Sequence, residues 1–219
     1  MKVGRNFSTV GVVVAGALLG LFALGLSIPV EAQVGESSEL LNPNRAGEDE
    51  LTELPHVDAA KAELILKQRP FASISEMQSA VFPELIPVQQ DELYRRLFIP
   101  LNLNTASREE ILLIPGVGGR MAHEFEEYRP YRALAQFRRE IGKYVDDKEV
   151  ARLAQYVFVP IDLNTASDEA ILSIPGVGDR MLHEFKEYRP YKSIEQFRRE
   201  IGKYVDAKEL ARLERYVTL

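Results

Sequence analysis

Between residues 101 and 160 the chain alternates short apolar stretches with turn residues, and the apolar positions recur at the three- and four-residue spacing of amphipathic helices. Four helices are predicted, around the apolar sets Ile111, Leu112 and Ile114; Met121, Ala122, Phe125 and Tyr128; Phe137 and Ile141; and Val150, Leu153 and Val157. No stretch shows sustained period-two alternation. We therefore expect an all-α protein, without strand pairing inside any unit.

Turn and capping residues separate these helices. Ser107 and Glu110 form a capping-box pattern at the start of the first helix, which Pro115 stops. A Gly-Val-Gly turn at residues 116–118 leads into the second helix, which ends before Pro130. Gly142 breaks the third helix, and the fourth begins at about residue 147.

The whole pattern returns with an offset of 60 residues and no gap. Three segments recur without a change: residues 103–107 as 163–167, residues 114–118 as 174–178, and residues 136–146 as 196–206. Applied backwards, the offset places Pro55 on Pro115 and the pair Arg69-Pro70 on Arg129-Pro130. We divide the chain into copy one (residues 41–100, diverged), copy two (101–160) and copy three (161–219). Repeats of this kind predict a linear array in which each copy packs on its neighbours.

The N-terminus has the features of an export signal. Lys2 and Arg5 precede an apolar run over residues 10–26, and Val30-Glu31-Ala32 places small residues at a cleavage site. We predict a signal peptide over residues 1–32, cut before Gln33, and a linker over 33–40. The alternative is a membrane anchor over residues 10–26, since that run is long for a signal peptide and close to the roughly 20 residues that span a bilayer. Either way the rest of the chain is expected to be periplasmic or otherwise extracytoplasmic; a thylakoid lumen also fits.

Composition excludes several kinds of chemistry. The chain has no cysteine, which removes disulfides, thiolate metal sites and cysteine nucleophiles. With three histidines a zinc site would need mostly carboxylates, which is rare, so we expect neither a metal nor a cofactor. No combination of nucleophile, base and orienting group stands out, and a non-enzymatic protein without a small-molecule substrate is predicted.

The net charge is −6, and −7 without Lys2, Arg5 and Glu31, so the chain as a whole attracts polyanions poorly. The charge is unevenly distributed, however. Residues 33–100 hold six Lys and Arg against twelve Asp and Glu, whereas residues 101–160 hold nine of each. The acidity belongs mostly to copy one.

The turn at residues 116–118 is the candidate binding site. Glycines on both sides of Val117 allow positive φ and a close approach of another backbone, while the valine anchors the turn in the core. Free N–H groups at the start of the next helix, with its dipole behind them, suit a phosphate oxygen. We therefore nominate the residues of this turn and their counterparts in copy three: Gly116, Val117, Gly118, Gly119, Arg120, Gly176, Val177, Gly178 and Arg180.

A short helix, Pro-Gly-Val-Gly and an amphipathic helix ending in Tyr-Arg form the pattern of helix-hairpin-helix proteins. Leu-Asn-Thr-Ala-Ser at 103–107, Ile-Pro-Gly-Val-Gly at 114–118 and Glu-Tyr-Arg-Pro-Tyr at 127–131 more closely resemble the ComEA-like competence proteins. The resemblance covers residues 101–219 well and 41–100 weakly. It implies three SAM-like helix-hairpin-helix units that bind double-stranded DNA outside the cytoplasmic membrane, with a DNA-uptake channel or other extracytoplasmic proteins as further partners.

A second resemblance leaves an alternative open. The Ile161-Asp162-Leu163-Asn164 opening, a hairpin and Pro-Tyr are also similar to the PsbU-type extrinsic proteins of photosystem II, which use this scaffold for lumenal protein contacts. The negative charge and Asp179, at the position of Gly119, favour that protein-contact module. The intact Gly-Val-Gly pair favours DNA.

Two other turns depart from the pattern. Copy one has His56-Val57-Asp58 in place of Gly-Val-Gly, so both glycines are lost and a carboxylate is gained. We expect copy one to lack the site and to act as a structural cap or a partner surface. The second turn of copies two and three, at residues 141–146 and 201–206, also lacks the Gly-hydrophobic-Gly pattern, which leaves one phosphate-binding hairpin per copy.

Overall fold

The computed structural model describes residues 40–219 together with Met1. The predicted signal peptide or anchor and almost all of the 33–40 linker therefore lie outside the described residues. Among the described residues, none of the helices has the length and apolarity needed to cross a bilayer.

The described chain is mostly helical, and each copy holds four helices. In copy one they are α1 (Glu48–Thr52), α2 (Ala59–Gln68), α3 (Ile74–Val81) and α4 (Pro87–Tyr94). Copy two has α5 (Arg108–Ile111), α6 (Gly119–Glu127), α7 (Leu134–Ile141) and α8 (Asp147–Ala154). Copy three has α9 (Asp168–Leu172), α10 (Asp179–Glu187), α11 (Ile194–Ile201) and α12 (Ala207–Glu214). Helices α6, α7 and α8 are reproduced by α10, α11 and α12 at an offset of 60 residues.

The first helix of copy two starts as predicted and ends early. The Ser107 hydroxyl accepts the Glu110 N–H at 3.2 Å, and a Glu110 carboxylate oxygen accepts the Ser107 N–H at 3.0 Å, which completes the capping box. The helix was expected to run to Ile114, but α5 ends at Ile111. The N–H groups of Leu113 and Ile114 bond to carbonyls three residues back, so the chain tightens before Pro115.

The expectation of no strand pairing was wrong. β1 (Leu101–Asn102) pairs in parallel with β2 (Val157–Phe158), and β3 (Ile161–Asp162) pairs in parallel with β4 (Val217–Thr218). Copy one has a parallel bridge between Leu41 and Leu97 at the same place. Each pair joins the first residues of a copy to its last. Two-residue strands are too short for any alternation to be visible in the sequence.

The packing of neighbouring copies repeats along the chain. Phe98, at the end of copy one, meets Tyr156 of copy two with ring centroids 5.0 Å apart, and Phe158 stacks on Tyr216 of copy three at 4.3 Å. The buried residues of copies one and two merge into one core, whereas Phe158 joins the separate core of copy three. Copies one and two thus each pack an aromatic side chain from near their end against the copy that follows.

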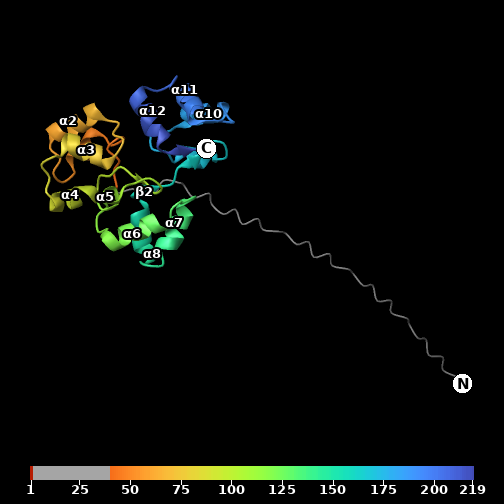
Figure 1. Cartoon of the computed structure of the whole chain (residues 1–219), viewed down its shortest axis with the longest axis horizontal. Coiled ribbons are helices and arrows are strands. Elements are labelled where there is room, and N and C mark those ends of the chain that lie inside the picture. Colours follow the sequence, from red (N-terminus) through yellow and green to blue (C-terminus); the bar gives the residue numbers. More distant parts are fainter. Residues whose placement is uncertain (2–39) are drawn as a thin grey trace.

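The prediction of a linear array was incomplete, because copies one and three also touch. The Lys208 ammonium of α12 donates a hydrogen bond to the Gln68 carbonyl and lies 5.6 Å from the centre of the Phe71 ring. Figure 1 shows copy three beside α2 and α3 of copy one, with copy two adjoining both. The three copies form a closed cluster rather than a row.

A clamp between two sequence motifs is repeated in all three copies. The side-chain amide of Asn104 accepts the Tyr131 N–H at 2.6 Å and donates to the Tyr131 carbonyl at 2.9 Å. Asn44 makes the same two bonds to Phe71, and Asn164 makes them to Tyr191. In each copy these bonds join the segment before the first helix to the segment before the third helix. They satisfy backbone groups that would otherwise lack partners.

An arginine reinforces the clamp. Arg129 donates to the carbonyls of Leu103 and Ala106 at 2.6 and 2.7 Å, and Arg189 repeats this with Leu163 and Ala166. The Leu-Asn-Thr-Ala-Ser and Tyr-Arg-Pro-Tyr motifs therefore hold each other in place. Their recurrence is explained by the fold.

Candidate nucleic-acid interface

The predicted turn connects α5 to α6 in copy two and α9 to α10 in copy three. Gly116 and Gly176 adopt positive φ, +80° and +87°. Val117 and Val177 are each 8% exposed and face the core, and their N–H groups bond to the carbonyls of Ile114 and Ile174. Glycine adopts positive φ at the lowest conformational cost, so the first glycine favours the reversal of the chain.

The second glycine has a different role from the one expected. Gly118 and Gly178 have extended φ, −100° and −114°, and are the N-cap residues of α6 and α10. Neither helix has a side-chain cap, and a Cβ built on either glycine meets nothing within 4 Å. The expectation of positive φ at both glycines was wrong for the second. Its importance lies in the open space that it leaves in front of the helix N-terminus.

That open space exposes hydrogen-bond donors. The first three N–H groups of an α-helix have no partner within the helix, and their partial positive charge adds to the helix dipole. In α6 these groups belong to Gly119, Arg120 and Met121. In α10 they belong to Asp179, Arg180 and Met181. The arrangement can hold an oxyanion.

The flanking charges differ between the two copies. Arg120 and Arg180 are exposed and form no ion pair with any residue in the described part of the chain, so both guanidinium groups are accessible to a ligand. Gly119 of copy two is replaced by Asp179, an exposed carboxylate in the first turn of α10. The turn of copy three therefore carries a negative charge that copy two lacks.

An ion pair links the two helices of each hairpin. Arg108 of α5 pairs with Glu126 of α6 at 2.6 Å, and in copy three Asp168 of α9 pairs with Lys186 of α10, also at 2.6 Å. The charges are reversed at equivalent positions while the contact is kept. This exchange indicates that the two hairpins share one geometry.

Copy one has the same turn, but a side chain caps the helix that follows it. His56 takes the positive φ, +62°, and Val57 is buried as its counterparts are. Asp58 caps α2, its carboxylate accepting the Lys61 N–H at 2.9 Å. A carboxylate therefore occupies the space in front of the helix N-terminus that Gly118 and Gly178 leave open in copies two and three.

In copies two and three, the second turn also ends in an aspartate that caps the helix that follows it. Asp146 caps α8 by accepting the Glu149 N–H at 2.8 Å, and Asp206 caps α12 by accepting the Glu209 N–H at 2.8 Å. Gly142 and Gly202 have ordinary helical φ, −61° in both cases. Neither turn offers an uncapped helix N-terminus.

Two arginines that the sequence did not single out lie against the first glycine of each turn. A Cβ built on Gly116 would lie 3.4 Å from Arg152 Nη2, and one built on Gly176 would lie 3.2 Å from Arg212 Nη2. They come from α8 and α12, 36 residues further along the chain. The only sequence signal was a paired exchange: where copy one changes Gly to His56, it also changes Arg to Glu92.

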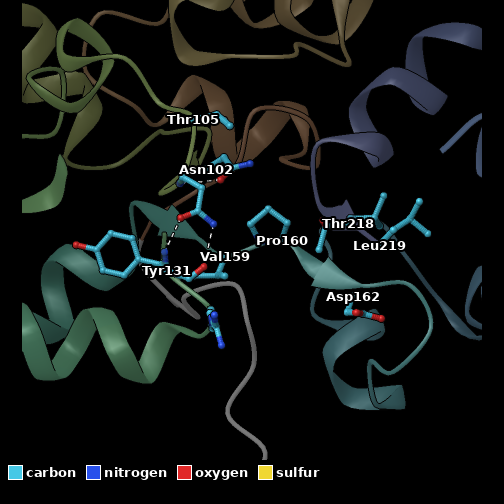
Figure 2. Close-up of a pocket in the computed structure, with 11 residues that line it drawn as sticks. Asn102, Thr105, Tyr131, Val159, Pro160, Asp162, Thr218 and Leu219 are labelled. Carbon is cyan, nitrogen blue, oxygen red and sulfur yellow. Dashed lines mark hydrogen bonds between the residues drawn. The ribbon is translucent and has the colours of Figure 1, made fainter. Parts of the chain in front are cut away.

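A separate cavity of about 720 Å³ lies at the junction of copies two and three. Figure 2 shows Asn102 and Tyr131 on one side, Asp162, Thr218 and Leu219 on the other, and Val159 and Pro160 between them. None of the turn residues lines it. Within the described residues there is also no group of three or more His, Asp or Glu side chains placed to hold a metal ion.

Comparisons of the chain with family models, with curated proteins and with solved structures find no match.

Proposed function

We propose that this protein binds double-stranded DNA without sequence specificity, outside the cytoplasm, through the turns of copies two and three. The single observation that carries the proposal is the contrast at one position: Gly118 and Gly178 leave α6 and α10 uncapped, whereas Asp58 caps α2. An uncapped N-terminus behind a glycine turn suits a phosphate oxygen. Contacts of this kind position a protein on the DNA backbone and read no sequence.

DNA uptake is the context that fits an exported DNA-binding protein of this kind. The exposed Arg120 and Arg180 add a charge-assisted contact to a neighbouring phosphate. In this proposal each unit is a helix-hairpin-helix module, the partner is duplex DNA, and a membrane uptake channel receives it. Copy one, with its capped turn, contributes packing to copies two and three instead of a phosphate contact.

A protein-contact module is the second candidate, and two observations favour it. The net charge of −6 opposes binding to a polyanion, and Asp179 places a carboxylate in the first turn of α10. In this alternative the helix-hairpin-helix scaffold binds another extracytoplasmic protein through its surface and does not bind DNA.

Fluorescence anisotropy with labelled duplexes separates the two candidates. The protein is titrated into two duplexes of unrelated sequence at about 50 mM salt, where electrostatic binding is strong. DNA binding predicts similar affinities for both duplexes and a shallow decrease with salt, since few phosphates are neutralised. An absence of binding at this salt concentration would contradict the DNA proposal and leave the protein-contact module.

A further inference from the structure

The guanidinium groups that lie against the first glycine of each turn are held in fixed positions. Arg152 donates from Nε and Nη2 to the two carboxylate oxygens of Glu149, both at 2.7 Å, and its guanidinium lies 5.7 Å from the Tyr156 ring centre. Arg212 repeats this with Glu209, at 2.7 and 2.6 Å, and with Tyr216 at 5.9 Å. A bidentate pair backed by an aromatic ring loses little further entropy when a ligand arrives.

Arg152 keeps unused hydrogen-bonding capacity, whereas Arg212 is only 4% exposed and acts on its turn through its charge. Arg152 Nη1 is buried and has no hydrogen-bond partner among the described residues. The bonds from Arg152 hold the pKa of the Glu149 carboxyl below its usual range, so this carboxylate stays ionised and paired. Each turn thus has a cation beside its first glycine, two residues before the N-cap glycine of the uncapped helix.

Copy one shows the reverse arrangement at the same positions. Glu92 stands where the arginine would be, and its Oε2 lies 2.7 Å from His56 Nε2. Gln89 replaces the glutamate that pairs with the arginine. Since a Cβ at the first glycine would crowd the arginine, the Gly-Arg pair and the His-Glu pair are alternative ways to fill one space. The exchange reverses the charge beside the turn.

We propose that Arg152 and Arg212 determine which turns accept an anion: the positive charge of each guanidinium favours phosphate binding at its turn, and Glu92 makes the turn of copy one reject it. The inference rests on the proposed function and deepens it, because it names the charge that makes two of three similar turns competent. The ligand class is a phosphodiester oxygen.

The first test removes both guanidinium groups. Arg152→Met with Arg212→Met keeps the apolar stems and is expected to weaken duplex binding at least about tenfold at 50 mM salt, since each turn loses a neighbouring positive charge. Arg139→Met with Arg199→Met is the matched control: it removes the same charge from exposed residues of α7 and α11 and should change affinity much less. Equal losses in the two variants would overturn the inference.

A second variant separates a direct role from neutralisation of the glutamates. Adding Glu149→Gln and Glu209→Gln to the methionine variant restores the net charge of the unmodified protein. A direct contribution predicts that affinity stays below that of the unmodified protein. Full recovery would show that the arginines only screen Glu149 and Glu209, and would overturn the inference. Arg152→Lys with Arg212→Lys should retain an intermediate affinity, because it keeps the charge and loses the fork geometry.

A gain-of-binding variant keeps the inference testable if the methionine variant does not fold. His56→Gly, Asp58→Gly, Glu92→Arg and Gln89→Glu give copy one the residues of copies two and three, and should raise DNA affinity. The same variant with Glu92 retained is the control and should gain less. Equal gains in both would contradict a role for the arginine.

Inorganic phosphate distinguishes failure of this inference from failure of DNA binding. Phosphate titrated against the ¹⁵N-labelled protein should shift the amide resonances of residues 118–121 and 178–181, and the shifts should be lost in the methionine variant. If the protein binds DNA and the methionine variant binds it equally well, only the role of the arginines is wrong. If DNA does not bind but the phosphate shifts depend on the arginines, the inference stands and the DNA proposal fails.

Discussion

The turns of copy one and copy two have the same backbone reversal and opposite chemistry. In both, the middle valine is buried, 7% exposed in copy one and 8% in copy two, and the residue before it has positive φ. Copy two then presents an uncapped helix with Arg152 beside it. Copy one presents a helix capped by Asp58 with Glu92 beside it. The fold therefore does not require glycine at the second position, and what the glycine provides is an accessible, uncapped helix N-terminus.

The residues that are shared by all three copies have a structural role. The asparagine clamp and the arginine before the proline occur in copies one, two and three, including the copy whose turn is filled. Their contacts are to backbone groups inside each copy. The residues that recur in all copies thus maintain the fold, and the positions that differ between copies include the proposed site.

The largest effect is expected from making the turns of copies two and three like that of copy one. Gly118→Asp with Gly178→Asp should lower DNA affinity about 100-fold, because each new carboxylate both caps the helix and repels phosphate, at about 1.4 kcal/mol per site. Stability should rise rather than fall. Both glycines have extended φ and open space for a Cβ, and Asp in place of Gly at an N-cap stabilises a helix by about a few tenths of a kcal/mol.

Anisotropy and thermal unfolding of the same variant provide the check. Opposite changes in affinity and in melting temperature would rule out misfolding as the cause of weaker binding. A variant that melts higher and binds DNA as well as the unmodified protein would show that the phosphate does not lie at these helix N-termini.

A smaller effect, on stability alone, is expected from the shared clamp. Asn164→Ala removes the bonds of 2.6 and 3.0 Å to the Tyr191 backbone, and should lower the free energy of unfolding by about 1–3 kcal/mol, since buried groups lose their partners. The melting temperature should fall by roughly 2–4 °C for each kcal/mol. Circular dichroism measures this, and Lys192→Ala, at an exposed neighbouring site, should leave the melting temperature nearly unchanged.

These contrasts explain how far the sequence could lead. Helical spacing, the capping box and the breaking residues gave the helix order of each copy, because they are local signals. The parallel strand pairs, the contact of Lys208 with copy one and the approach of Arg152 to Gly116 join residues far apart in the chain. No local sequence pattern predicts these contacts. The φ of Gly118 was misjudged because glycine permits positive φ without requiring it.

The exposed arginines should contribute less than the turn itself. Arg120→Ala with Arg180→Ala leaves both turns intact and should reduce affinity roughly three- to tenfold, since each removes one solvated contact worth about 0.3–0.7 kcal/mol. The slope of log affinity against log salt should become shallower by about 2, one phosphate per arginine. Anisotropy over a salt series measures both quantities. A lower affinity with an unchanged slope would mean that neither arginine contacts a phosphate.

The smallest effect compares copy two with copy three, which differ in the first turn of the binding helix. Asp179→Gly gives copy three the residue of copy two and should raise DNA affinity about two- to fivefold, since a charge at a helix N-terminus is worth roughly 0.3–1 kcal/mol. The same acid favours its helix, so stability should fall by a similar amount. Gly119→Asp is the reciprocal control and should weaken binding by the same factor. Matching changes of opposite sign would place a phosphate at the first turn of both helices. If neither substitution moves the affinity, the phosphate contacts lie elsewhere on the protein, and the acidic first turn of α10 becomes an argument for a protein partner.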